Sequence, residues 1–331
     1  MKVIFYSTYK FDAPYLQETN KHYNYELTFV DMPLDYKNIE LAKGHDVVSC
    51  LTNDALDQEV LHKLAEFGIK LIALRAVGYD HVDLLAAQSL GITVCHVPLY
   101  SPNAIAEFAI GLLLSLVRKI HIAYCDVKLH NFTIDDKVGF NLCDKVAGII
   151  GLGNIGIIAA KILIGFGCKV LGFDVKQSQQ CVDMGVEYVP LETLLRESDV
   201  ISLHCPLCKP TYHLISDKEI NIMKNKVIIV NTARGAIIDT KALINGLKNK
   251  KIGGVAFDVY DKEKELFFLD LSDQNIFDEN YLFLEAQPNV LITSHQAFLT
   301  KEALINRANT TFKNIRAFET HSSDICLCNN E

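Results

Sequence analysis

Hydrophobic and polar positions follow two different periods along the chain. Segments with apolar residues three and four positions apart predict helices at Gln58–Phe67 and Asp83–Ser89. Strands that alternate with helices are typical of a parallel sheet with helices on both faces. The pattern therefore predicts an α/β fold built on a doubly wound sheet. Short apolar runs predict the strands of its first part, at Lys2–Tyr6, Leu27–Val30, Asp46–Cys50, Lys70–Arg75 and Ile92–Val94.

The pattern changes after Pro98. Ser101 and Pro102 are suited to begin a helix, and apolar residues then recur at helical spacing as far as the basic pair Arg118-Lys119. We predict one long helix over residues 102–120, with a buried face that serves as a spine between two domains. Its apolar positions are Ile105, Phe108, Ala109, Leu112, Leu113 and Leu116.

A second α/β run begins at Lys145. The segment from Tyr260 to Pro288 lacks periodicity and predicts a long functional loop, and a helical pattern from Thr300 to Thr320 has no strand after it. That last helix must therefore pack on an existing domain. We predict one domain from residues 1–99 plus 299–331 and a second from residues 100–298. The strands of the second are expected at Lys169–Phe173, Asp199–His204, Lys226–Asn231, Gly253–Asp258 and Val290–Thr293.

The first strand of the second run leads directly into a Gly-x-Gly-x-x-Gly motif. Its residues are Gly151, Leu152, Gly153, Asn154, Ile155 and Gly156. The first glycine would make a tight turn, the second would let the backbone approach a pyrophosphate, and the third would let helix and strand pack closely. Phosphates would then bind at the helix N-terminus. We predict that this Rossmann-type domain binds the dinucleotide NAD at the glycine motif. The alternative is a glycine turn with a purely structural role.

The next strand ends at Asp174, about 30 residues after the βαβ unit begins. A carboxylate at this position accepts hydrogen bonds from ribose hydroxyls and repels a 2′-phosphate. Asp174 therefore favours NAD over NADP.

Charge and composition exclude several classes of partner. The formal net charge is −8, which provides no basic field for nucleic acid or an anionic membrane. The longest apolar run, Ala104–Val117, contains Glu107 and is too short to span a membrane. The N-terminus reads as a first strand and not as a signal peptide, so we expect a cytoplasmic protein.

Ten cysteines in a chain of this size do not indicate a disulfide scaffold. Cys205 and Cys208 have the spacing of a redox or zinc site, but no second pair stands at a useful distance. We favour a structural role and predict no metal. Cys326 and Cys328 are expected in a mobile tail.

Three polar groups follow apolar strands at the edge where open α/β sheets bind their ligands. Arg234 lies beside a glycine and can donate two hydrogen bonds to a carboxylate, although a solvated loop arginine is the plainer interpretation. His295 ends the last strand, where a structural histidine is the common alternative. Asp258, Asp261 and Glu263 follow another strand and alone would be an ordinary charged loop.

The order Arg234, Glu263, His295 behind this glycine motif resembles the D-2-hydroxyacid dehydrogenase family. The segments Val97–Ala104, Leu266–Phe268 and Ser294–Phe298 are most similar to its bacterial fermentative D-lactate dehydrogenases. The likeness covers nearly the whole chain. Departures are Ala233 in place of a frequent Ser, Asp261 in place of Glu, and the pair Tyr79-Asp80, none of which removes a catalytic group.

The resemblance implies reversible reduction of pyruvate to D-lactate by NADH. Arg234 would bind the substrate carboxylate, His295 would donate a proton to the ketone oxygen, and Glu263 would orient His295. Backbone amides of Val77 and Gly78, with the side chain of Tyr100, would also bind the carboxylate. The remaining residues expected to line the cofactor are Cys205, Pro206, Thr232, Ala233 and Asp258, together with Arg234 and His295.

The resemblance leaves alternatives open. Within the family, the substrate could instead be 2-oxoisocaproate, glyoxylate or hydroxypyruvate. Pocket volume decides such preferences, one methylene is worth only about 1–3 kcal/mol, and the sequence argues only mildly among these acids. Tyr100 could be a hinge aromatic that only packs. A different class, an NAD-sensing binding protein, would not need His295. The family also implies a homodimer or homotetramer, and the helix at residues 102–120 is the expected contact.

Overall fold

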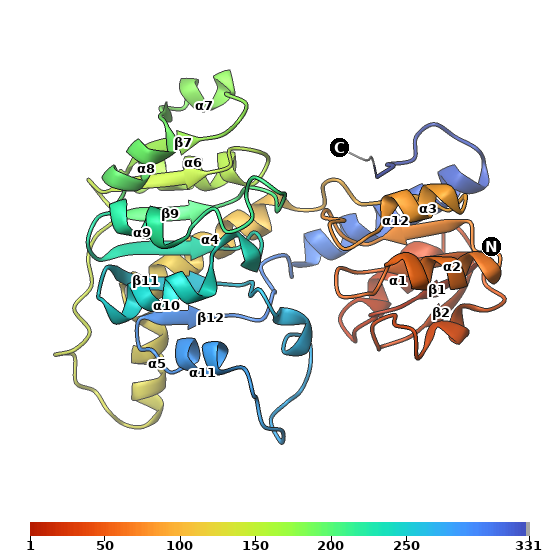
Figure 1. Cartoon of the computed structure of the whole chain (residues 1–331), viewed down its shortest axis with the longest axis horizontal. Coiled ribbons are helices and arrows are strands. Elements are labelled where there is room, and N and C mark those ends of the chain that lie inside the picture. Colours follow the sequence, from red (N-terminus) through yellow and green to blue (C-terminus); the bar gives the residue numbers. More distant parts are fainter. Residues whose placement is uncertain (329–331) are drawn as a thin grey trace. The chain divides into compact units, whose positions relative to one another are not determined.

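The structure is a computed structural model that describes residues 1–328. The chain divides into two compact units. The first contains Met1–Ser101 and the chain from Leu299 onward, and the second contains Pro102–Phe298. The first boundary thus lies two residues after the predicted one, and the second lies where it was predicted. Both units carry a parallel sheet with helices on both faces, which confirms the predicted fold class (Figure 1).

The first unit is built on a five-stranded parallel sheet in the order β2-β1-β3-β4-β5. Its helices are α1 (Ala13–Asn20), α2 (Gln58–Glu66), α3 (Leu84–Ser89) and α12 (Lys301–Glu319), with a short 3-10 helix η1 (Ile39–Ala42). Asp57 caps α2 and Thr300 caps α12 through side-chain acceptors, which fixes where both helices begin. The strands are β1 (Lys2–Phe5), β2 (Glu26–Phe29), β3 (Val47–Cys50), β4 (Leu71–Leu74) and β5 (Thr93–Cys95).

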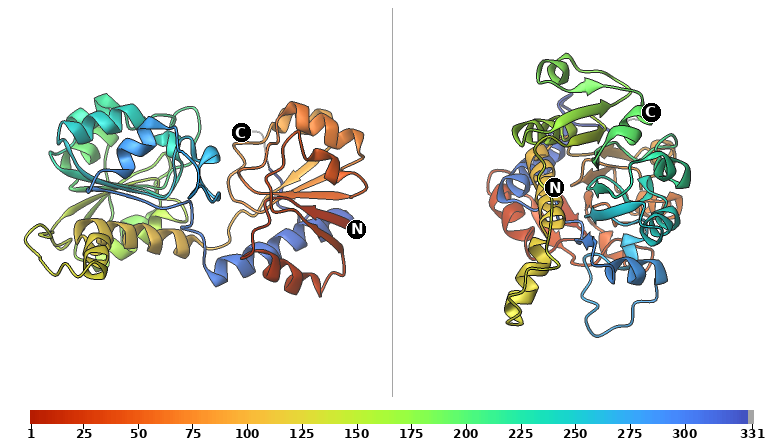
Figure 2. Two further views of the ribbon diagram at one scale, coloured as in Figure 1. Left: turned by 90° about the horizontal axis from the view of Figure 1, so that it is seen from below. Right: turned by 90° about the vertical axis from the view of Figure 1, so that its left-hand side faces the viewer.

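Alternation along the strands divides the core of the first unit into two layers. In β1, Ile4 packs in the layer beneath α2 and α3, whereas Val3 and Phe5 pack in the layer beneath α1 and α12. Phe312 of α12 is fully buried in that second layer. The helix predicted over residues 300–320 therefore packs on the first sheet, as the sequence required (Figure 2).

The C-terminal segment after α12 lies along β5. Leu327 forms an antiparallel bridge with Cys95, and the Cys328 amide donates to the Val94 carbonyl at 3.0 Å. Cys328 also packs against the apolar layer beneath α2 and α3. Cys326 and Cys328 were expected in a mobile tail, but the segment pairs with backbone groups at the open edge of β5.

The second unit is built on a seven-stranded parallel sheet in the order β12-β11-β10-β9-β6-β7-β8. The order reverses at β6, so the loops after β6 and β9 part from each other at a topological switch point, where α/β sheets bind ligands. Its strands are β6 (Val146–Ile150), β7 (Lys169–Phe173), β8 (Glu187–Tyr188), β9 (Val200–Leu203), β10 (Val227–Asn231), β11 (Ile252–Phe257) and β12 (Val290–Ile292).

Helices cover both faces of the second sheet (Figure 1). One layer of core residues lies beneath α4 (Pro102–Val117) and α6 (Gly156–Gly165). The other lies beneath helices on the opposite face. These are α8 (Leu191–Glu197), α9 (Asp217–Ile222), α10 (Thr240–Lys248) and α11 (Glu279–Glu285). The unit also contains α7 (Gln179–Asp183) and the 3-10 helices η2 (Gly235–Ile237) and η3 (Glu263–Glu265).

Two predicted segments differ from the structure. The long helix ends at Val117, because Lys119 adopts a left-handed conformation (φ 53°), and α5 (Ile120–Lys128) follows at a bend of 64°. The segment from Tyr260 to Pro288 is not structureless, because Asp278 caps α11 with its side chain. Among residues 1–328 no single helix is long and apolar enough to cross a membrane. Helices α4 and α5 reach that length and hydropathy only as a bent pair. Half of the residues of α4 are buried in the core.

Candidate active site

The glycine motif forms the turn between β6 and α6. Gly151 has a φ of +92°, which side chains rarely adopt, and a Cβ there would lie 2.5 Å from the Cys205 amide nitrogen. A Cβ on Gly156 would lie 1.9 Å from the Gly151 carbonyl oxygen. The chain itself therefore requires both glycines.

Gly153 is different, because a Cβ at this position would meet no atom within 4 Å. Nothing in the described protein demands a glycine there, whereas a pyrophosphate close to the backbone would. Asn154 and Ile155 follow it into the first turn of α6, whose N-terminal N–H groups attract anions. This open position beside a helix N-terminus fits the phosphates of a dinucleotide.

Asp174, directly after β7, holds the glycine turn. Its Oδ2 accepts a hydrogen bond from the Leu152 amide at 2.6 Å, and its Oδ1 accepts from the Lys176 amide at 3.0 Å. Each carboxylate oxygen has a second lone pair that can accept from a ribose hydroxyl. The carboxylate thus orders the turn and keeps acceptor capacity for the ribose.

The end of β9 packs against the same turn. Burial raises the pKa of the Cys205 thiol to about 11, so the sulfur stays protonated and unreactive. Burial also lowers the pKa of His204 to about 4, and its Nε2 contacts the Ser202 hydroxyl at 2.8 Å. Pro206 lies in the loop after β9, and its carbonyl accepts a hydrogen bond from the Thr211 hydroxyl. Cys205 and Cys208 are both free thiols.

The arginine turn (residues 231–235) follows β10. Asn231 organises it, since its Oδ1 accepts from the Ala233 amide at 3.0 Å and its Nδ2 donates to the Arg234 carbonyl at 2.9 Å. The Thr232 hydroxyl is buried and has no hydrogen-bond partner among residues 1–328. A buried hydroxyl of this kind usually bonds to a ligand or water, and a cofactor ribose would satisfy it.

His295 and Glu263 form a hydrogen-bonded pair in the second unit. The His295 Nδ1 lies 2.8 Å from the Glu263 Oε1, and both side chains are largely buried. Because a carboxylate accepts, Nδ1 carries the hydrogen and Nε2 is left to exchange a proton with a substrate. The other Glu263 oxygen accepts from the Tyr260 amide at 3.1 Å, which fixes the carboxylate.

Asp258 holds the histidine turn (residues 293–297). Its carboxylate accepts from the Thr293 hydroxyl at 2.6 Å, the Gln296 amide at 2.9 Å and the Ala297 amide at 2.7 Å. Its carbonyl accepts from the His295 amide at 2.8 Å. Burial raises the pKa of Asp258, and these hydrogen bonds oppose the rise. Sequence reasoning placed Asp258 beside a cofactor and missed this structural task.

His295 itself has a φ of +55°, in the left-handed region that non-glycine residues seldom occupy. Such strain persists only where the surroundings impose it, and the four hydrogen bonds to Asp258 do so. Phe268 and Phe298 flank the ring, with centroids 5.9 Å and 6.4 Å from the imidazole. They limit the access of water to the His295–Glu263 pair.

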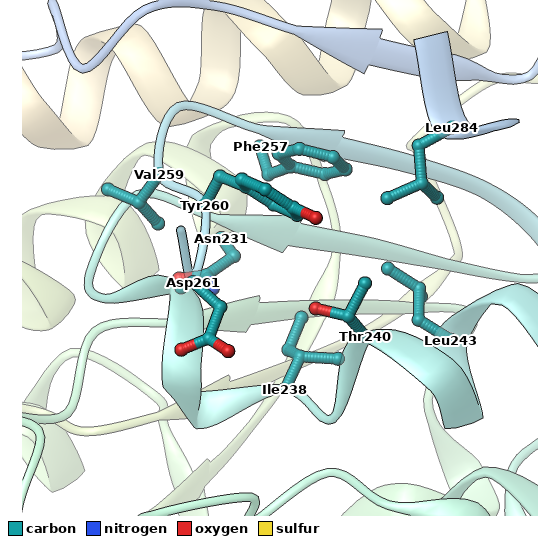
Figure 3. Close-up of a pocket in the computed structure, with 10 residues that line it drawn as sticks. Asn231, Ile238, Thr240, Leu243, Phe257, Val259, Tyr260, Asp261 and Leu284 are labelled. Atoms are coloured by element: carbon teal, nitrogen blue, oxygen red, sulfur yellow. The ribbon is translucent and has the colours of Figure 1, made fainter. Parts of the chain in front are cut away.

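A small pocket of about 20 Å³ is lined in part by Asn231 and Gly235 of the arginine turn. Figure 3 shows the side chains of Phe257 and Tyr260 on one side of it and those of Ile238, Thr240 and Leu243 on the other. Neither Arg234, Glu263 nor His295 lines it. The pocket is therefore distinct from the histidine pair.

The remaining predicted residues belong to the first unit. Val77 and Gly78 lie in the amide loop (residues 75–79) after β4, and Val77 is 41% exposed. Tyr100 precedes the unit boundary, and its carbonyl accepts from the Asn306 Nδ2 at 2.9 Å. The amide loop begins at a fully buried arginine, Arg75.

Arg75 is part of a buried charge cluster. It donates to the Asp12 carboxylate, the Ser49 hydroxyl and the carbonyls of Tyr6 and Ser7. Arg307 of α12 donates to the other Asp12 oxygen at 2.8 Å. The cluster ties the start of the amide loop to β1, β3 and α12. Among residues 1–328, no three histidine, cysteine or acidic side chains are grouped so as to hold a metal ion.

Known proteins resemble this chain along most of its length. The family described as D-isomer specific 2-hydroxyacid dehydrogenase, NAD binding domain, matches residues 110–297. A D-lactate dehydrogenase of Escherichia coli (strain K12) is 47% identical over 319 residues, which cover 96% of this chain and 97% of that protein.

Solved structures also resemble this chain over nearly its whole length. The pyruvate reductase of Chlamydomonas reinhardtii is 39% identical, covers 97% of both chains and superposes with a TM-score of 0.91. A D-lactate dehydrogenase from Aquifex aeolicus, complexed with NAD and lactic acid, is 34% identical, covers 96% of both chains and has a TM-score of 0.87.

Proposed function

The chain belongs to the D-isomer specific 2-hydroxyacid dehydrogenase family, and we propose that it is an NAD-dependent D-lactate dehydrogenase. It reduces pyruvate to D-lactate and catalyses the reverse oxidation. The observation that carries the proposal is the 2.8 Å hydrogen bond between His295 and Glu263, which leaves Nε2 as an acid–base group beside a dinucleotide-binding sheet. The named relatives supply the choice of lactate.

The second unit provides the residues for NAD. The phosphates bind at Gly153, Asn154, Ile155 and Gly156, at the N-terminus of α6. The space beside Gly153 is open, since an added Cβ there would meet no atom within 4 Å. Asp174 accepts from the adenosine ribose, and Thr232 bonds to the nicotinamide ribose. The other residues that we assign to the NAD site are Gly151, Cys205, Pro206, Ala233, Arg234, Asp258 and His295.

The chemistry is hydride addition to a ketone carbon with protonation of its oxygen. Bound NADH supplies the hydride. Arg234 binds the substrate carboxylate with two hydrogen bonds and polarises the ketone oxygen. His295, as imidazolium, gives its Nε2 proton to that oxygen, and Glu263 stabilises the imidazolium before transfer. In the reverse direction, neutral His295 accepts the hydroxyl proton.

The first unit supplies further substrate contacts in this proposal. The amides of Val77 and Gly78 bind the second carboxylate oxygen, and Tyr100 contacts the same group. Support comes from the exposure of Val77 at the carboxyl edge of a parallel sheet, where such folds bind ligands.

We also propose a homo-oligomer, but with a different contact from the helix at residues 102–120. Most apolar residues of α4 pack in the core of their own unit, so few of them are available to a partner. The arm from α5 to Val138 exposes apolar side chains instead, at Ile120, Tyr124, Leu129, Phe132, Ile134 and Val138. Phe132→Asp with Ile134→Asp should yield monomers by light scattering, whereas Val175→Asp, at a 93% exposed site of the same unit, should not.

We also propose that the protein is located in the cytoplasm. All ten cysteines are free, which fits a reducing compartment such as the cytoplasm.

The test is oxidation of NADH by the purified protein with pyruvate, glyoxylate, hydroxypyruvate and 2-oxoisocaproate, with the product separated by chirality. Preference for pyruvate and formation of D-lactate is the expected result. Preference for a bulkier acid keeps the roles of Arg234, Glu263 and His295 but overturns the assignment of lactate. Tight NADH binding without turnover of any acid overturns the enzyme and favours an NAD-sensing protein.

A further inference from the structure

A chain of hydrogen bonds links the C-terminal segment to the amide loop. The His96 Nδ1 lies 2.8 Å from the Val77 carbonyl oxygen. Because a carbonyl only accepts, the histidine ring is the donor. The neighbouring Val97 amide donates to the Ala76 carbonyl at 3.1 Å. Two successive carbonyls of the amide loop are thus held by the segment that leaves β5.

The bond to Val77 fixes more than one atom. In a trans peptide, the carbonyl and the N–H of the next residue point in opposite directions within one rigid plane. When His96 holds the Val77 oxygen, the Gly78 N–H must therefore point away from His96. Glycine is the residue least able to hold its own orientation, because it has no side chain to restrict φ and ψ.

His96 is itself held from both sides of its backbone. Its amide donates to the Cys326 carbonyl at 2.9 Å, and its carbonyl accepts from the Asn314 Nδ2 at 2.8 Å. The Asn314 Oδ1 accepts from the Cys326 amide at 3.0 Å, and Asn314 is buried. The Tyr79 ring meets the His96 ring edge to face at 5.0 Å. The C-terminal segment (residues 325–328) thus completes the setting of His96.

We propose that His96 is a positioning residue that aims the Gly78 amide at the substrate carboxylate, and that the C-terminal segment holds His96 in place for this task. The proposal rests on the proposed function, which assigns carboxylate binding to the amides of Val77 and Gly78. His96 touches neither substrate nor cofactor in this scheme and acts only through the peptide plane.

The experiment compares His96→Ala with His96→Asn in the full-length protein. In asparagine, as in histidine, a donating nitrogen is bonded to Cγ, so His96→Asn can keep the bond to Val77. Loss of the bond in His96→Ala should raise the KM for pyruvate about three- to tenfold. His96→Asn should stay within about twofold of wild type, and kcat and the Kd for NADH should be unchanged in both. His62→Ala, an exposed histidine of α2 in the same unit, is the matched control.

A second readout does not depend on turnover. Deuterium exchange of residues 75–80 should be faster in His96→Ala, and in a variant that ends at Asp324, than in wild type or His96→Asn. If the shortened variant does not fold, the His96 pair decides alone. An unchanged KM together with unchanged exchange in His96→Ala overturns the proposal.

The two proposals fail differently. If wild type reduces none of the 2-oxo acids, the proposed function fails, and the exchange experiment then decides whether His96 orders the amide loop. If wild type reduces pyruvate but His96→Ala and His96→Asn raise KM equally, the enzyme stands and the positioning role is overturned.

Discussion

The two units hold their loops at the carboxyl edges of similar parallel sheets by different means. In the second unit, one buried carboxylate, Asp258, accepts three hydrogen bonds from the histidine turn. In the first, the amide loop starts from a buried charge cluster of Asp12, Arg75 and Arg307. In the proposed function, the side chain of His295 acts directly and needs its backbone held in one strained conformation. The amide loop would offer its own N–H groups and needs its whole path held. Hydrogen bonds to a single carboxylate suffice for the former, and links to several elements serve the latter.

The largest effect is expected where the second unit uses a side chain directly. His295→Asn keeps a donor toward Glu263 but has no group that transfers a proton near neutral pH. We expect kcat for pyruvate reduction to fall about 10²–10⁴-fold, with NADH still bound. Steady-state kinetics and NADH fluorescence measure the two quantities. A variant that retains kcat within about tenfold would show that His295 is structural.

The charge cluster of the first unit should govern stability. Arg75→Met removes the donor to four groups and leaves part of a buried charge uncompensated, which typically costs about 3–5 kcal/mol of unfolding free energy. Arg316→Met, at an exposed position on α12, should cost less than about 1 kcal/mol. Denaturant titration measures both, and NADH affinity should not change. Equal stability of the two variants would contradict a special role for the cluster.

Asp258→Asn tests whether the histidine turn depends on one acceptor. The new amide NH₂ would face either the Ala297 amide or the donors on Oδ1, and a buried donor left without an acceptor costs about 1–3 kcal/mol. If that cost appears as misplacement of His295, kcat falls about 5- to 100-fold while the KM for NADH changes little. An unchanged kcat with lowered stability would separate the fold of the turn from its chemistry.

Local patterns made the sheets and the glycine turn predictable. Short stretches of sequence contain all the signals that were used. These are the apolar runs that form strands, the polar residues that follow them, and the spacing of Gly151, Gly153 and Gly156. Long-range contacts were not predictable. Asp258 meets Ala297 39 residues further along the chain, and Leu327 of the C-terminal segment pairs with Cys95 of β5, 232 residues earlier in the chain. Helix α11 was missed although Asp278 is a recognisable N-cap. The acidic and aromatic residues around it obscure the helical spacing of its apolar residues.

The last prediction concerns His204, a partly buried histidine beside the glycine turn. Its pKa of about 4 in the folded chain lies below the usual value of 6.5, so between these values the unfolded chain binds a proton that the folded chain does not. Stability is therefore lost as the pH falls from about 6.5 to about 4, by up to about 3 kcal/mol.

His204→Gln removes the titrating group and keeps a polar partner for Ser202. The protection factors of the β9 amides, from deuterium exchange corrected for the pH dependence of the intrinsic exchange rate, should fall more in wild type than in this variant between about pH 6.5 and about pH 4, with the difference growing as the pH falls. The amide loop of the first unit should show no such difference between the two proteins. A parallel fall in protection in both proteins would mean that acid acts on the second unit through carboxylates whose pKa the fold lowers, such as Asp199 and Asp278, and not through His204.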